Sequence, residues 1–155
     1  MKVKHLILTS CLTAGVAFAA DHANFSGSWQ FNPEKSKNVG MMSQMKMNQT
    51  IGQSDTALDV TTHTTFQGKN DDSNTHYDLT GKPATNESPM GGPAETVTKW
   101  QGGKLVTTWT SESAVAGGPK VVRTETRSLS PDGRTMTLES VRSSNPVLVM
   151  VFEKK

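Results

Sequence analysis

Short segments in which apolar and polar residues alternate follow one another along the chain from residue 24 onward. In one of them, Leu58, Val60 and Phe66 share one face, and Asp59 lies on the other. Alternation with a period of two is typical of half-buried β-strands. Threonine, whose branched side chain favours a pleated sheet over a helix, is abundant in these segments. No stretch after residue 20 carries a sustained apolar stripe at helical spacing, so the sequence predicts an all-β chain.

Turn-forming residues separate the extended segments. Asn32-Pro33, Gly102-Gly103 and Pro131-Asp132-Gly133 are such turns, and Asn145-Pro146 introduces the last apolar segment. They leave about nine segments joined by short connections. Because only 34% of the residues are apolar, closure into a barrel suits the chain better than two sheets with dense inner faces. The predicted fold is a single antiparallel up-and-down β-barrel of about 8–10 strands.

Three regions carry more specific expectations. Residues 41–51 are predicted to form one strand, and residues 68–74, which include Asp71 and Asp72, are predicted to form an exposed turn. Residues 80–93 are rich in glycine and proline and lack alternation, which predicts a long loop. Such a loop on a rigid barrel is either a gate for a ligand or a disordered connector.

The first nineteen residues have the pattern of a secretory signal peptide. A positively charged start is followed by the apolar residues 6–18, and Ala17 and Ala19 supply the small residues of a cleavage site after Ala19. Leu8-Thr9-Ser10-Cys11 also resembles a bacterial lipobox, but it leaves too short an apolar region before the cysteine. We therefore expect a signal peptide at 1–19, a domain at 20–155, and a periplasmic or secreted location without stable membrane insertion.

The charge and the thiol of the precursor both belong to this predicted leader. The whole chain has 16 basic and 14 acidic residues, but Lys2, Lys4 and the single Cys11 lie before the cleavage site. The mature chain is then neutral and free of cysteine, which excludes disulfides and cysteine-based metal sites. A neutral chain without a basic stripe also argues against a nucleic-acid partner.

Catalytic motifs are lacking around the remaining histidines, His22, His63 and His76. We therefore expect a protein that is not an enzyme and that has no resident cofactor.

Short motifs carry a resemblance to a known superfamily. Gly27-x-Trp29 stands at the start of the first predicted strand, and residues 151–155 form an apolar-to-basic final strand. Trp100–Leu105 and Leu129–Gly133 have the form of tight hairpins. Together these segments resemble the lipocalin and fatty-acid-binding (calycin) superfamily, in particular bacterial secreted lipocalin-like proteins. The resemblance implies a barrel that binds a small apolar or amphipathic molecule in its interior, with Gly27 and Trp29 as a structural signature.

The resemblance also implies that Trp29 covers the closed end of the barrel with a cation stacked on its ring, for which Arg127 and Arg142 are candidates.

The sequence differs from those of the fatty-acid binders in two respects. The segment 33–40 is too short for the pair of helices that fatty-acid binders carry after the first strand. Met150 and Phe152 occupy the positions where those proteins hold a carboxylate with Arg-x-Tyr, so a fatty acid is not implied.

Apolar residues of the predicted strands are the candidate walls of a ligand cavity, with threonine hydroxyls orienting polar groups. Trp100 and Trp109 lie on neighbouring strands, where they form a cross-strand pair or line the cavity. The candidate ligand-binding residues are Met45, Met47, Leu58, Val60, Phe66, Trp100, Trp109, Met136, Leu138 and Met150.

Two other functions remain open. Cleavage after Ala19 leaves Ala20-Asp21-His22 at the terminus, where an amine, two amides and an imidazole suit Cu(II), and four clustered thioethers suit Cu(I). This alternative is a periplasmic copper-binding protein that uses His22, Met41, Met42, Met45 and Met47. The other alternative is a structural or inhibitory barrel whose interior is filled by side chains.

Overall fold

The computed structural model describes residues 22–89, 91–143 and 145–155. Ten antiparallel strands form one sheet in the order β4-β3-β2-β1-β10-β9-β8-β7-β6-β5. The predicted all-β barrel is confirmed; the predicted leader at 1–19 lies outside the described residues. The strands are β1 (Gly27–Phe31), β2 (Lys46–Gln53), β3 (Ala57–Phe66), β4 (Lys69–Asp78), β5 (Ala84–Glu87), β6 (Pro93–Gln101), β7 (Lys104–Ser111), β8 (Val121–Leu129), β9 (Thr135–Arg142) and β10 (Leu148–Lys154).

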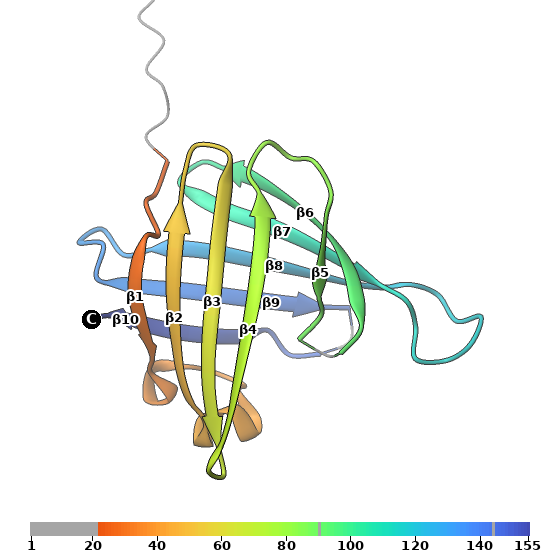
Figure 1. Ribbon diagram of the computed structural model, residues 1–155, viewed down its shortest axis with the longest axis horizontal. Coiled ribbons are helices and arrows are strands. Elements are labelled where there is room, and N and C mark those ends of the chain that lie inside the picture. The colour runs from red at the N-terminus through yellow and green to blue at the C-terminus, as the bar shows by residue number, and fades with distance from the viewer. Residues whose placement is uncertain (1–21, 90, 144) are drawn as a thin grey trace, which may run out of the picture.

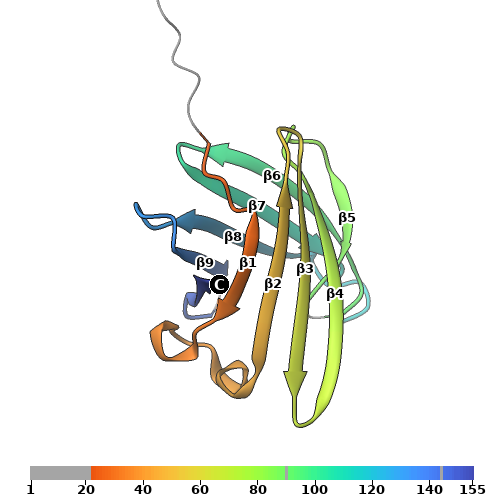
Figure 2. The same cartoon turned by 60° about the vertical axis from the view of Figure 1, so that its left-hand side comes forward.

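The sheet curls into a nearly closed barrel. Strands β1 to β4 run upright in Figure 1, and strands β6 to β10 cross behind them at a steep angle (Figures 1 and 2). The first and last strands close one side, with Trp29 opposite Lys154 and Phe31 opposite Phe152. Strands β4 and β5 are the two ends of the sheet order and are not paired through their backbones. This seam is therefore the place where the barrel is open.

The side chain of Asn86 bridges the seam. The buried Asn86 of β5 accepts a hydrogen bond from the backbone N–H of His76 on β4 at 2.9 Å and donates to the His76 carbonyl at 2.8 Å. Its amide also donates to the hydroxyl of Thr96 on β6 at 2.8 Å. The side-chain amide of Asn86 therefore makes the two hydrogen bonds to His76 that a backbone peptide group would make if β4 and β5 were paired.

Replacing Asn86 with alanine is expected to lower the free energy of unfolding by about 1–3 kcal/mol, because both backbone groups of His76 lose their partner. Urea denaturation followed by tryptophan fluorescence measures this change. Thr85→Ala, at the exposed neighbouring position, is the matched control. An Asn86→Ala midpoint equal to that of the control contradicts the bridging role.

The predicted turn at 68–74 is wrong, because only Gln67 and Gly68 turn the chain. Both have positive φ, 49° and 77°, and they place Phe66 opposite Lys69 as in a two-residue hairpin. Strand β4 begins at once, so Asp71 and Asp72 lie in a strand. Four hydrogen-bonded pairs of polar side chains cross the outer face of this hairpin and support it: Asp59–His76, Thr61–Asn74, His63–Asp72 and Thr65–Asn70.

Two other expectations also need correction. Residues 80–93 are not one long loop, because they contain β5. The chain at 41–51 is not one strand, because Gly40–Gln44 forms a short 3-10 helix, η2, before β2 begins. Gly40 has a φ of 52°, and the hydroxyl of Ser43 donates to the Gly40 carbonyl at 2.7 Å. This local geometry keeps residues 40–44 out of the extended conformation, so β2 begins only at Lys46.

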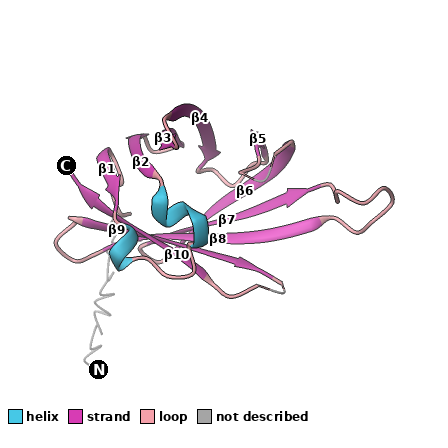
Figure 3. Cartoon of the chain, turned by 90° about the horizontal axis from the view of Figure 1, so that it is seen from below, coloured by secondary structure: helices cyan, strands magenta, loops and turns pink. Residues whose placement is uncertain are grey.

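Two 3-10 helices stand between β1 and β2, where the sequence indicated too little room for a helical pair. The first, η1, spans Pro33–Lys35 and is capped by the side chain of Asn32. Both helices lie at the lower end of the barrel in Figure 1 and are coloured cyan in Figure 3, which shows the chain from below. Among the described residues, neither helix has the length and apolar character needed to cross a membrane.

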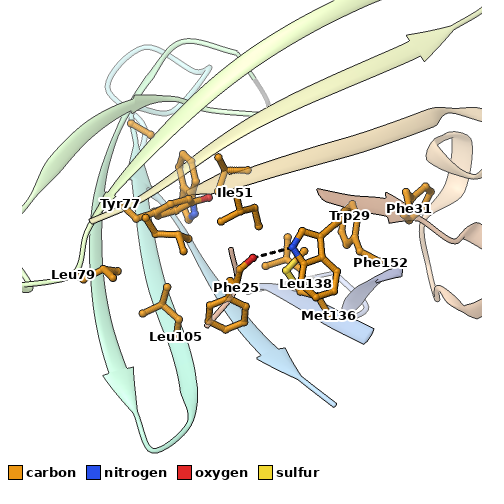
Figure 4. Close-up of a cluster of buried hydrophobic side chains, with 14 of the residues drawn as sticks. Phe25, Trp29, Phe31, Ile51, Tyr77, Leu79, Leu105, Met136, Leu138 and Phe152 are labelled. Atoms are coloured by element: carbon orange, nitrogen blue, oxygen red, sulfur yellow. Dashed lines mark hydrogen bonds between the residues drawn. The ribbon is translucent and has the colours of Figure 1, made fainter. Parts of the chain in front are cut away.

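A cluster of buried aromatic and aliphatic side chains packs one end of the barrel, which we call the closed end (Figure 4). Trp29 is fully buried, and its indole N–H donates to the carbonyl of Phe25 at 2.8 Å. The cation on its ring is the ammonium of Lys154, 5.3 Å from the ring centroid, and not the predicted Arg127 or Arg142. A Cβ at Gly27, where φ is 129°, would lie 3.1 Å from Cε of Lys154. Gly27 therefore leaves space for the lysine that covers Trp29.

Candidate functional site

The lower half of the barrel encloses a cavity of about 490 Å³. Its apolar walls come from η2, β2, β3, β9 and β10, and hydroxyl groups of β3 and β4 complete the lining. We call this cavity the methionine lobe. Its lining includes Met42, Met45, Met47, Val60, Leu138, Met150, Thr62, Thr64, Ser73 and Thr75.

A second cavity of about 510 Å³ adjoins the first. It reaches the rim near Asn145 and Pro146, and we call it the arginine lobe. The two lobes share Met42, Pro89, Glu125 and Met150, so they form neighbouring halves of one interior space. The residues that line only the arginine lobe are Asn38, Arg123, Ser140, Arg142, Asn145, Pro146 and Leu148.

A charged cluster on β8 stands where the lobes meet. Glu125 is 7% exposed and accepts a hydrogen bond from the indole N–H of Trp109 at 3.0 Å. Nη2 of Arg123 lies 3.1 Å from the other carboxylate oxygen, and its guanidinium carbon lies 4.8 Å from the centroid of the Trp109 ring. Trp109 thus fixes both partners of a buried ion pair.

Arg127 lies on the same face of β8 as Arg123 and Glu125, nearer the closed end of the barrel. It is 4% exposed, and its Nη1 donates to Oε1 of Gln49 at 3.3 Å and to the sulfur of Met136 at 3.2 Å. Its guanidinium carbon lies 5.9 Å from the centroid of the Tyr77 ring. The structure therefore gives Arg127 partners within the barrel wall.

Tyr77 provides a pH-dependent test of this interior. Burial raises the pKa of Tyr77 to about 12, and the negative charge of Glu125 adds to the rise. Because the folded state holds the proton more tightly than the unfolded chain, this stabilisation is complete below pH ~10 and is lost as the pH rises toward 12. The expected loss is about 2–3 kcal/mol.

Absorbance titration measures this pKa directly, because the chain contains a single tyrosine. Tyr77→Phe is the control, and its stability should not show this alkaline component. A native-state midpoint near pH 10, the ordinary value for tyrosine, contradicts the buried environment.

The predicted ligand-binding residues divide between the two ends of the barrel. Met45, Met47, Val60, Trp109, Leu138 and Met150 line the methionine lobe. Leu58 and Met136 are fully buried in the core, and Phe66 is half-buried at the end of β3, outside the lining of either lobe. Trp100 does not pair with Trp109: it packs against Phe25, with ring centroids 6.1 Å apart, at the closed end.

The candidate copper ligands are also separated. The His22 ring, which precedes β1, stacks on Trp100 of β6 with ring centroids 4.2 Å apart. Met41, which is 71% exposed, and Met42 lie on η2, between β1 and β2. No group of three or more histidine, cysteine, aspartate or glutamate side chains suited to a metal occurs in the described part of the chain. The structure therefore does not bring His22 and the methionines into one site.

The sequence interpretation missed the charged cluster of β8. Arg123, Glu125 and Arg127 are spaced two residues apart, which puts all three on one face of a strand. Thr124 and Thr126 occupy the other face, so the charge pattern was visible. What the pattern does not show is that the charged face points inward.

The three-dimensional arrangement resembles solved structures. Fatty-acid-binding protein 1 of Echinococcus granulosus aligns with a TM-score of 0.65 at 14% identity, covering 84% of this chain and 96% of that chain. The REP1-NXSQ fatty acid transporter gives 0.62 at 17%, covering 84% and 95%. The chain has the fold of the fatty-acid-binding proteins. A mutant of the fluorescent protein UnaG gives 0.63 at 14%, covering 84% and 96%. No protein-family model and no curated protein matches the sequence.

At these identities the likeness establishes the fold alone, an antiparallel β-barrel as the sequence predicted. Met150 and Phe152 lie on the final strand, β10, and their side chains face the interior of the barrel. The arginines that line the two lobes come instead from β8 and β9.

Proposed function

We propose that this chain is an exported, non-enzymatic, lipocalin-like protein that binds a small apolar or amphipathic molecule inside its barrel. The observation that carries the proposal is the methionine lobe, an interior space of about 490 Å³ with thioether and aliphatic walls. This volume lies within the range of about 300–1,000 Å³ that small-molecule sites occupy. The barrel is packed at its closed end and hollow at its other end, which favours a binding protein over a filled structural barrel.

The lining suits ligands of variable shape. Met42, Met45, Met47 and Met150 have flexible, polarisable side chains that adapt to irregular apolar surfaces. Burial of apolar ligand surface contributes roughly 25 cal/mol per Å², and the hydroxyl groups of β3 and β4 orient polar atoms. Two of the similar structures are described as a fatty-acid-binding protein and a fatty acid transporter, which supports an apolar ligand.

Filling the methionine lobe tests the proposal. Met47→Trp places a bulky ring in the lobe, whereas Val122→Trp places the same ring on the outer face of β8, where Val122 is 50% exposed. With 1-dodecanol as the probe in calorimetric titration, we expect Met47→Trp to weaken binding about tenfold or more and Val122→Trp to have no effect. If the parent protein does not bind the probe, or if both variants bind as the parent does, the proposal fails.

Export is the second part of the proposal. It rests on the residues that precede the barrel, with cleavage after Ala19 and a mature domain of residues 20–155. Intact mass measurement of protein recovered from the periplasm of a bacterial host tests it, and the expected mass corresponds to a chain that begins at Ala20. Recovery of the full-length chain from the cytoplasm alone contradicts it.

A further inference from the structure

Two arginines face each other inside the barrel. Arg123 of β8 and Arg142 of β9 are direct partners in the antiparallel register, and both line the arginine lobe. Like charges at directly opposed positions of a sheet destabilise it. Among the described residues that line this lobe, Glu125 is the one carboxylate, beside two guanidinium groups.

Arg123 also has unsatisfied donors. Its Nε and Nη2 are buried and have no hydrogen-bond acceptor among the described residues. Nη2 lies within ion-pair distance of Glu125, 3.1 Å from Oε1, but does not form a hydrogen bond with it. Buried donors without an acceptor are costly, at about 1–3 kcal/mol each. An anion that enters the arginine lobe supplies the acceptor that Arg123 lacks and reduces the repulsion from Arg142.

The methionine lobe has the opposite electrostatic character. Its lining contains three carboxylates, Asp71, Glu87 and Glu125, and one guanidinium, that of Arg127. Arg127 already donates to Gln49 and to the sulfur of Met136. An anionic group is therefore disfavoured in the methionine lobe and favoured in the arginine lobe.

We propose that the arginine lobe is the subsite for the anionic group, a carboxylate or a phosphate, of an amphipathic ligand whose apolar part occupies the methionine lobe. The inference rests on the proposed function. Guanidinium groups bind both kinds of anion through paired hydrogen bonds. Ser140 and Asn145, which also line this lobe, bring further polar groups to the site. The ligand then lies with its charge toward the rim near Asn145 and its chain toward β2 and β3.

Ligands of equal chain length separate the contribution of charge from that of burial. We expect dodecanoate or dodecyl phosphate to bind the parent protein about tenfold or more tightly than 1-dodecanol, as charge-assisted hydrogen bonds predict. Arg142→Gln keeps the Arg123–Glu125 pair and should remove most of this preference, because it weakens the binding of the anions much more than that of 1-dodecanol. Arg134→Gln, at an exposed position beside β9, is the matched control and should keep the preference.

The outcomes distinguish the two proposals. If no ligand binds, the proposed function fails and the subsite with it. If the anions and the alcohol bind the parent protein equally, the subsite alone is wrong. If Arg142→Gln weakens all ligands equally, its role is structural, which also overturns the subsite. If Arg127→Gln removes the preference and Arg142→Gln does not, the anion binds at the other end of β8 and the inference is wrong.

A measurement on the parent protein does not depend on the folding of any variant. Raising the ionic strength should weaken the binding of dodecanoate more than that of 1-dodecanol, because only the anion gains from the charge of the lobe. Equal salt dependence of the two affinities overturns the inference.

Discussion

Replacing Trp29 with alanine is expected to lower the free energy of unfolding by about 3–5 kcal/mol. The ring is fully buried between the ends of the first and last strands. Its loss leaves a cavity in the closed end and removes the hydrogen-bond donor of the Phe25 carbonyl and the ring beneath Lys154. Equilibrium denaturation in urea measures the change, and a loss of this size is a large fraction of the stability of a small domain.

Trp29→Phe separates packing from hydrogen bonding at this position. It keeps most of the apolar volume but leaves the Phe25 carbonyl without its donor, so we expect a smaller loss of about 1–3 kcal/mol. If the alanine and phenylalanine variants lose the same stability, the hydrogen bond and not the ring closes the barrel. An unchanged midpoint for Trp29→Ala contradicts the role of the ring altogether.

Replacing Glu125 with alanine is expected to have an effect of similar size, about 3–5 kcal/mol, because one partner of a buried ion pair is removed. Arg123 then remains beside Arg142 and near Arg127 without the carboxylate, and the indole N–H of Trp109 has no acceptor. Thermal and urea denaturation both measure the loss.

Glu125→Gln is the informative companion. Glutamine retains an oxygen for Trp109 but not the negative charge, so the difference between the two variants reports the electrostatic part of the interaction. The loss of stability caused by removing the charge of Glu125 should also be larger at low ionic strength, where the remaining guanidinium groups repel one another more strongly. Equal stability of the parent and Glu125→Ala is incompatible with the buried pair.

The strands with an apolar face were predictable, whereas the mostly polar strand β4, which also lines the cavity, was not. Strand β3 places Leu58 and Val60 inward against the core, and its alternation was clear in the sequence. Strand β4 places Asp71, Ser73 and Thr75 on the cavity and His76 on the outside. Because a cavity wall does not need to be apolar, β4 is polar on both faces and resembled a turn.

Interactions between residues that are far apart in the sequence explain why the cation on Trp29 and the role of Asn86 were not predicted. The sequence indicated that a cation covers Trp29, but the choice of Lys154 depends on the register between β1 and β10, which joins the two ends of the chain. In the same way, the role of Asn86 depends on a seam between two strands that do not pair. Neither relation leaves a local signal in the sequence.

The pairing of β1 with β10 has a consequence for how the chain folds. Trp29 meets Lys154, so the contact that closes the barrel joins residues near the two ends of the described chain. Contacts of such long sequence separation slow folding, because the entropy of closing the loop must be overcome before they form. During synthesis, β10 is the last of the ten described strands to leave the ribosome. The barrel therefore cannot close before β10 has been synthesised and is free to pair with β1.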